Sequence, residues 1–72
     1  MIMDEGLRYL SAALAVGLGA IATGLAQARI GSAGAGAVAE KPEVMGSIFI
    51  LTALPETMVI LGFVIAAIIL FA

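Results

Sequence analysis

The segment from 44 to 72, VMGSIFILTALPETMVILGFVIAAIILFA, has 29 positions and a single ionisable residue, Glu56. About 20 apolar residues are enough to cross the hydrocarbon core of a bilayer, so this segment predicts a transmembrane helix. A charge near the centre of such a helix costs at least about 2.5 to 3.5 kcal/mol on insertion scales. We therefore expect Glu56 to have a function that justifies this cost.

The rest of the chain completes a helical hairpin. A second long apolar segment precedes a cluster of charges in which Pro42 disfavours helix at the residue before it. The first residues are acidic and lack the basic segment of a secretory signal, so we expect them to belong to the mature chain. The sequence therefore predicts an all-α membrane protein with a tail at 1–5, helices at 6–39 and 44–72, and a polar loop at 40–43.

The composition excludes several classes of protein. The chain has 72 residues, 64% of them apolar and only 11% charged, which does not fit an ordinary soluble domain. It contains no cysteine and no histidine, so chemistry linked to pH must come from a carboxylate. We expect no catalytic residues, no cofactor and no nucleic-acid partner.

The two arms differ in side-chain volume. Of the 29 residues from 11 to 39, 17 are Gly or Ala, whereas the second arm is rich in Ile, Leu and Phe. Small residues let helix backbones approach closely in lipid, where no hydrophobic force drives association. Seven of them recur at spacings of four or three residues and form what we call the small-residue stripe: Ala13, Gly17, Ala20, Gly24, Ala28, Gly31 and Ala35. Thin inner helices and thick outer helices favour a homo-oligomeric ring of hairpins, and a hairpin dimer remains the alternative.

Gln27 and Glu56 are equally far from the centre of the turn, at about position 41.5, so we expect them to lie at the same depth. Gln27 is in phase with the small-residue stripe, which places its amide against a packed helix. An amide there could serve an ion site, or it could only hold the hairpin together with an interhelical hydrogen bond.

Pro55 precedes the carboxylate and cannot donate to the carbonyl four residues back, so the Leu51 carbonyl is expected to be free. The backbone carbonyl of Leu54 and the hydroxyl of Thr57 are further candidate ligands. The structural alternatives are a simple packing kink at Pro55 and a bond from Thr57 to the preceding turn.

Arg29 is two residues from Gln27 and nearly level with Glu56, so an ion pair within the hairpin is one alternative. Two residues correspond to a rotation of about 200° around a helix, which points Arg29 away from Glu56 if Gln27 points towards it.

Three segments resemble a known family: GLAQARIGSAG at 24–34, AEKPE at 39–43 and ALPETMVILGFVI at 53–65. They closely resemble the c-type rotor subunit, or proteolipid, of rotary ATP synthases, and the resemblance covers nearly the whole chain. The carboxylate follows the KPE turn by 13 residues, which is similar to the V/A-type branch, archaeal and vacuolar-like.

The resemblance implies that Glu56 carries the ion and that Gln27 borders the site, while Leu54 and Thr57 match positions that can coordinate the ion. Met58 stands where a sodium-binding relative has glutamine, and Leu61 stands where several relatives have tyrosine. Both departures remove polar atoms that a hard cation would need. We therefore favour protons as the transported ion. Na⁺ remains the alternative, bound by Glu56, Gln27, Thr57 and Leu54.

The partners implied by the resemblance are identical copies in a ring, a membrane stator subunit with a basic residue, central-stalk subunits at the loop side, and the lipid bilayer. The expected location is the cytoplasmic membrane of a prokaryote, with the loop on the cytoplasmic side because Arg29 and Lys41 are the basic residues nearest the turn. Two rival classes remain: a small proton-coupled transporter, and a structural or pore-forming hairpin that does not need Glu56.

Overall fold

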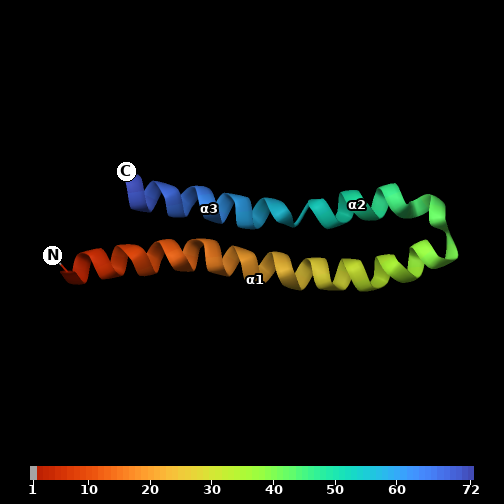
Figure 1. Ribbon diagram of the computed structural model, residues 1–72, viewed down its shortest axis with the longest axis horizontal. Coiled ribbons are helices and arrows are strands. Elements are labelled where there is room, and N and C mark those ends of the chain that lie inside the picture. Colours follow the sequence, from red (N-terminus) through yellow and green to blue (C-terminus); the bar gives the residue numbers. More distant parts are fainter. Residues whose placement is uncertain (1) are drawn as a thin grey trace.

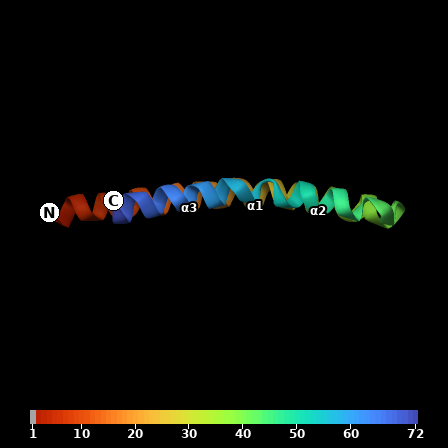
Figure 2. The ribbon, with the colours of Figure 1, turned by 90° about the horizontal axis from the view of Figure 1, so that it is seen from above.

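The computed structural model describes residues 2–72, with side chains from Asp4 onward, and Figure 1 shows an antiparallel helical hairpin. Its elements are the helix α1 (Ile2–Glu40), the short 3-10 helix η1 (Pro42–Val44), and the helices α2 (Met45–Ala53) and α3 (Glu56–Phe71). The hairpin measures 58 × 17 × 8 Å, and Figure 2 shows α1 lying directly behind α2 and α3. The described residues form two helical arms that are long and apolar enough to cross a membrane, as the sequence predicted.

Helix α1 begins at Ile2, so the expected tail at 1–5 is helical wherever it is described, and Met1 lies outside the described residues. The first turn carries Asp4 and Glu5. Carboxylates at a helix N-terminus interact favourably with its unpaired N–H groups and its macrodipole. This interaction explains why the acidic residues extend the helix and do not end it.

The turn is shorter than the expected loop at 40–43. Lys41 leaves the helical region, with φ −137° and ψ 88°, because the ring of Pro42 disfavours helical backbone at the preceding residue. The Lys41 N–H still donates to the Ala37 carbonyl at 2.8 Å, and the Val44 N–H donates to the Lys41 carbonyl at 3.0 Å. Pro42 itself starts η1, a position where its missing N–H costs nothing.

The second arm is divided into α2 and α3, whereas the sequence predicted one continuous helix. The division falls at Leu54 and Pro55. After it, the Thr57 N–H donates to the Leu54 carbonyl at 3.2 Å, and the Met58 N–H donates to the Pro55 carbonyl at 3.1 Å. These bonds join residues three apart, so the chain tightens for one turn before the α-helix resumes.

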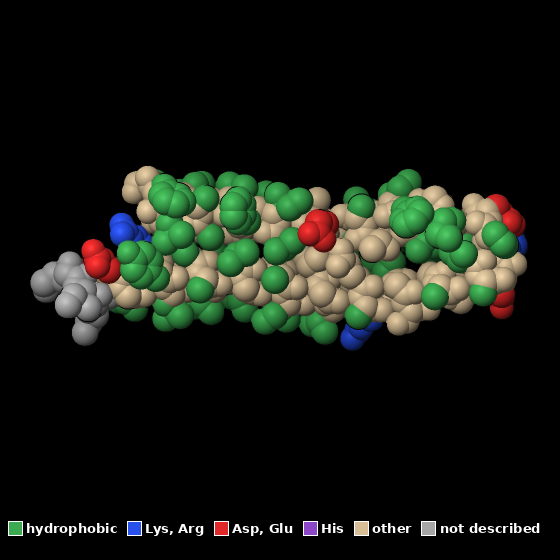
Figure 3. Space-filling model, in the orientation of Figure 1, with side chains coloured by type: hydrophobic (Ala, Val, Ile, Leu, Met, Phe, Trp, Pro, Cys, Tyr) green, Lys and Arg blue, Asp and Glu red, His purple; other side chains and the backbone are tan. Residues whose placement is uncertain are grey.

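Helix α1 packs along α2 and α3 through small side chains. The buried residues are Ala12, Thr23, Gly34, Gly62 and Ala66. Large apolar side chains point outward instead. In Figure 3, hydrophobic side chains cover much of one face between charged ends, and a single acidic group interrupts them near the middle.

The small-residue stripe does not make the contact within the hairpin. Six of its members are exposed, and only Gly17 is half-buried. The contact uses a neighbouring row of α1 that includes Ala12, Gly19, Thr23 and Gly34. One helix therefore has two small-residue faces, of which the hairpin occupies one and leaves the other free.

Two glycines allow the backbones to touch. A Cβ added at Gly62 would lie 2.5 Å from the Ala15 carbonyl oxygen, and one at Gly19 would lie 2.8 Å from the Met58 carbonyl oxygen. By contrast, a Cβ added at Gly36 would meet nothing within 4 Å. Both close contacts are with backbone atoms, which cannot move aside as a flexible side chain can.

We predict that Gly62→Ala and Gly19→Ala each destabilise the hairpin by about 1 to 3 kcal/mol, the usual cost of overpacking. The matched control is Gly36→Ala, which should leave the helix contact unchanged. The measurement is a titration with denaturing detergent, read by energy transfer between dyes at the two chain ends. Equal stability of the Gly62 and Gly36 variants would contradict the packing described above.

Candidate functional site

The centre of the hairpin holds a hydrogen bond between its two arms. The Gln27 amide nitrogen, Nε2, donates to Glu56 Oε2 at 2.9 Å. Gln27 lies in the middle of α1, and Glu56 is the first residue of α3. The equal depth predicted for these two residues is therefore confirmed.

The same amide nitrogen donates to the backbone carbonyl of Thr52 at 3.1 Å. Thr52 lies in the last turn of α2, where carbonyls have lost their partners further along the helix. Gln27 thus uses its two N–H groups on one backbone acceptor and one carboxylate. Because the Thr52 carbonyl can only accept, it holds the nitrogen side of the amide towards α2 and Glu56.

A second bond of this kind lies one turn away on α1. The Thr23 hydroxyl donates to the Pro55 carbonyl at 2.7 Å, and Thr23 is only 4% exposed. Neither Thr23 nor Thr52 was among the site residues predicted from the sequence. Together, the side chains of Thr23 and Gln27 donate hydrogen bonds to backbone carbonyls where the proline interrupts the backbone hydrogen bonding of the second arm.

The sequence did contain a signal for these residues. Between 12 and 28, Thr23 and Gln27 are the only polar residues, and they are four apart on one helix face. Thr52 and Glu56 have the same spacing on the other arm. Two polar pairs of equal spacing and similar depth in opposite arms of a hairpin indicate an interhelical hydrogen-bond network.

A hydrogen bond joins Leu54 and Thr57. The Thr57 hydroxyl donates to the Leu54 carbonyl at 2.8 Å, and both side chains are exposed. This local bond is the alternative predicted for Thr57 from the sequence, a bond to the preceding turn. Within the part of the chain that the structure describes, no hydrogen bond joins either residue to the pair of Gln27 and Glu56.

Glu56 itself is exposed in the single hairpin. Gln27 donates to its Oε2, and the rest of the carboxyl group is open to the lipid or protein that surrounds the hairpin in a membrane. A proton, a cation or a polar group of another protein could therefore reach it without disturbing the contact between α1 and α2.

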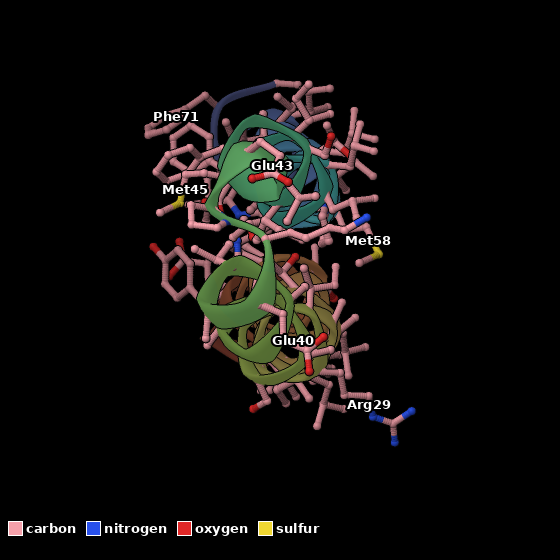
Figure 4. The ribbon with its side chains drawn as sticks, turned by 90° about the vertical axis from the view of Figure 1, so that its right-hand side faces the viewer. Arg29, Glu40, Glu43, Met45, Met58 and Phe71 are labelled. Atoms are coloured by element: carbon pink, nitrogen blue, oxygen red, sulfur yellow. The ribbon has the colours of Figure 1, made fainter. Side chains whose placement is uncertain are left out.

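Arg29 does not take part in this network. Its side chain is exposed and points away from α2 and α3 (Figure 4). The alternative of an ion pair between Arg29 and Glu56 within one hairpin is therefore wrong. The helical rotation between Gln27 and Arg29 explains the separation, because one faces the second arm and the other does not.

The amino-acid sequence is similar to those of known ATP synthase and ATPase subunits. The family model that describes the C subunit of ATP synthase matches residues 10–69. The K subunit of the A-type ATP synthase of Methanocaldococcus jannaschii is 40% identical over 65 residues, which are 90% of this chain and 30% of that protein. The K subunit of the V-type sodium ATPase of Enterococcus hirae is 38% identical over 66 residues, which are 92% of this chain and 42% of that protein.

A c-type ATP synthase subunit from Synechococcus sp. is similar over almost its whole length. It is 39% identical over 74 aligned positions, covering 97% of this chain and 91% of that protein. The chain thus spans less than half of each K subunit and nearly all of the Synechococcus protein.

A hairpin of two apolar helices with a hydrogen-bonded carboxylate at mid-span defines an integral membrane protein with a candidate ion site. The chain belongs to the family of ATP synthase C subunits. The resemblance predicted from the residues is confirmed.

We predict that Thr23→Val destabilises the hairpin by about 0.5 to 1.5 kcal/mol, because it removes the hydrogen bond that joins the two arms and leaves the Pro55 carbonyl with only its bond from the Met58 N–H. Thr23→Ser keeps the hydroxyl and should retain most of the stability. Ser11→Ala is the control, since the Ser11 hydroxyl is exposed and bonds only to Leu7 of its own helix. The same detergent titration measures all three, and a Thr23→Val loss no larger than that of Ser11→Ala would contradict the role of Thr23.

Proposed function

We propose that this chain is the membrane rotor subunit of a V/A-type rotary ATP synthase or ATPase, and that Glu56 carries the transported ion. The observation that supports the proposal best is the hydrogen bond from Gln27 to Glu56 in the middle of the apolar arms. Family membership supports the same role. ATP chemistry belongs to other subunits in this proposal.

The mechanism uses the two charge states of a carboxyl group. When Glu56 faces lipid, an apolar environment favours its neutral form, so that it crosses the bilayer without exposing a charge. When rotation brings it to a stator subunit with a basic residue, the positive charge favours the carboxylate, and the ion leaves. The N–H donated by Gln27 also stabilises the carboxylate and holds it in place at that moment.

Transport on this scheme requires many copies. One charge moved across about 100 mV corresponds to about 2.3 kcal/mol, so several ions must pass for each ATP. We propose a ring with α1 inside and with α2 and α3 outside. The free small-residue stripe of α1 supports this arrangement, because it offers a close-packing face that the hairpin does not use.

The remaining partners and the location are also proposals. Central-stalk subunits would contact the turn at Lys41 and Pro42, the stator subunit would contact α3, and lipid would surround the outer helices. The location is the cytoplasmic membrane of a prokaryote with the turn on the cytoplasmic side. The position of Arg29 and Lys41 in the turn half supports that orientation.

The orientation of the Gln27 amide favours protons. Its nitrogen is anchored to the Thr52 carbonyl, so it presents N–H and not oxygen to Glu56. A sodium ion is bound by oxygen atoms, and rotating the amide to supply one would turn its oxygen against the Thr52 carbonyl. The thioether of Met58 offers no hard ligand nearby in sequence.

Sodium is the second candidate because the relative from Enterococcus hirae is named as part of a V-type sodium ATPase. In that case Glu56, Gln27, the Thr57 hydroxyl and the Leu54 carbonyl would be the ligands. Within one hairpin the Thr57 hydroxyl donates to the Leu54 carbonyl, and neither group is hydrogen-bonded to Gln27 or Glu56.

We predict that Glu56→Gln abolishes ATP-driven ion uptake by vesicles that contain the whole complex, because an amide cannot exchange a proton. Glu56→Asp keeps the carboxyl group but shortens its reach to Gln27, so it should retain reduced transport. Glu43→Gln in the turn is the control and should transport normally. Normal transport by Glu56→Gln would refute the proposed function.

We also predict that a hydrophobic carbodiimide, which attacks protonated carboxyl groups in apolar surroundings, labels Glu56 in the purified assembly. Labelling should decrease as pH rises and should be indifferent to Na⁺ if protons are carried. Protection by Na⁺ at fixed pH would identify a sodium rotor instead. Mass spectrometry of the labelled peptide gives the result, and a complete lack of labelling would count against both ions.

A further inference from the structure

The hydroxyl of Thr23 has an unusual hydrogen-bond partner. A serine or threonine within a helix commonly donates to a carbonyl of the preceding turn of its own helix. The hydroxyls of Ser11, Thr52 and Thr57 do so, each at 2.8 Å. Thr23 instead donates to the Pro55 carbonyl of the opposite arm at 2.7 Å. Its hydroxyl is thus used between the arms, where it can set the position of the second one.

The Pro55 carbonyl lies at the start of α3. It also accepts the Met58 N–H at 3.1 Å, and its peptide group leads directly into Glu56. A hydrogen bond to this carbonyl therefore fixes the backbone from which the Glu56 side chain extends. Thr23 is only 4% exposed, so water has little access to replace its hydroxyl.

Gln27 binds on both sides of the break in the second arm. Its amide nitrogen donates to the Thr52 carbonyl of α2 and to the carboxylate of Glu56, the first residue of α3. The separation of these two acceptors depends on how α3 is placed relative to α2. Of the hydrogen bonds between the described residues, only that of Thr23 joins a side chain of α1 to the backbone at the start of α3.

Close packing brings α3 to α1 but does not by itself set the direction of Glu56. The backbone contacts at Gly19 and Gly62 are van der Waals contacts, which hold two surfaces together without a preferred direction. A hydrogen bond is directional and weakens steeply as its angle departs from linear. The bond of Thr23 therefore restricts the rotation of α3 at the level of the candidate ion site.

We infer that Thr23 is a positioning residue for ion exchange at Glu56. Its hydroxyl holds the start of α3, through the Pro55 carbonyl, at the rotation and depth at which Gln27 reaches the carboxylate at 2.9 Å. Thr23 acts through the backbone and is not itself a ligand of the ion. The inference deepens the proposed function and rests on it, because ion exchange at Glu56 belongs to that proposal.

A positioning role and a general role in stability predict different results. A general loss of stability loosens the whole contact between the arms and weakens both bonds of Gln27 together. A loss of positioning moves α3 alone, so Gln27 keeps its bond to Thr52 and loses its bond to Glu56. The two bonds of one atom, Gln27 Nε2, therefore distinguish the two roles.

Solid-state NMR of the purified assembly in lipid bilayers measures both bonds. Gln27 is the only glutamine, so ¹⁵N in the glutamine side chain labels one site. Its dipolar coupling to ¹³C at Glu Cδ reports the bond to Glu56, because the other glutamates lie at the ends of α1 and in η1. Its coupling to the Thr52 carbonyl carbon reports the other bond. Thr52 is the only threonine followed by alanine, so its signal is selected through the amide nitrogen of Ala53.

We expect Thr23→Val to lose the coupling to Glu56 and to keep the coupling to Thr52. Thr23→Ala should show the same selective loss, which separates the missing hydroxyl from the packing of valine. Thr23→Ser keeps the hydroxyl and should retain both couplings, as should the control Ser11→Ala. An unchanged coupling to Glu56 in Thr23→Val and Thr23→Ala, or an equal loss of both couplings, would overturn the inference.

Ion transport tests the same inference in the whole complex. ATP-driven ion uptake by vesicles should fall in Thr23→Val by up to about a hundredfold, the loss that a displacement of about 1 Å can cause at a reactive site. Uptake should recover in Thr23→Ser, and normal uptake by Thr23→Val would show that Thr23 serves stability alone. Failure of the proposed function is seen separately as normal uptake by Glu56→Gln, and the NMR couplings do not depend on transport.

Discussion

The structure depends on the interruption of the second arm at Leu54 and Pro55. Inside an apolar arm water cannot bind the backbone near this interruption, and side chains of α1 donate to two of its carbonyls. Thr23 supplies a hydroxyl to the Pro55 carbonyl, and Gln27 supplies an amide to Thr52. These two bonds fix the depth of one arm relative to the other. They also place the Gln27 amide beside the carboxylate of Glu56. The break between α2 and α3 thus positions the candidate ion site.

The second constraint is the volume available between the helices. Gly19 and Gly62 bring backbone against backbone, which is how helices associate in lipid without a hydrophobic driving force. Because α1 is rich in Gly and Ala around much of its circumference, it keeps the small-residue stripe free after the hairpin has formed. The bulky residues of α2 and α3 remain outside. A protein of this design is an incomplete unit whose free faces are suited to further copies and to lipid.

The two charges within the apolar arms have different chemistry and different surroundings. A carboxyl group can be neutralised by one proton, so Glu56 can alternate between a charged and an uncharged form as its surroundings change. A guanidinium group has no such neutral form in proteins. The hairpin keeps them apart by directing Gln27 and Glu56 towards each other and Arg29 away from both. An internal ion pair would hold Glu56 as a carboxylate and prevent the exchange that we propose for it.

The hairpin, the family, and the shared depth of Gln27 and Glu56 could all be predicted from the sequence. These features follow from length, composition and distance along a helix, which a linear chain specifies directly. The different directions of Arg29 and Gln27 could be predicted as well, because helical rotation is set by residue spacing. The choice of the small-residue row that forms the contact required the folded hairpin, since α1 offers two rows of similar composition. The same holds for the bonds of Thr23 and Thr52 in the network. Hydrogen-bond partners depend on the rotation of each helix about its own axis, and the sequence of one arm does not specify that rotation.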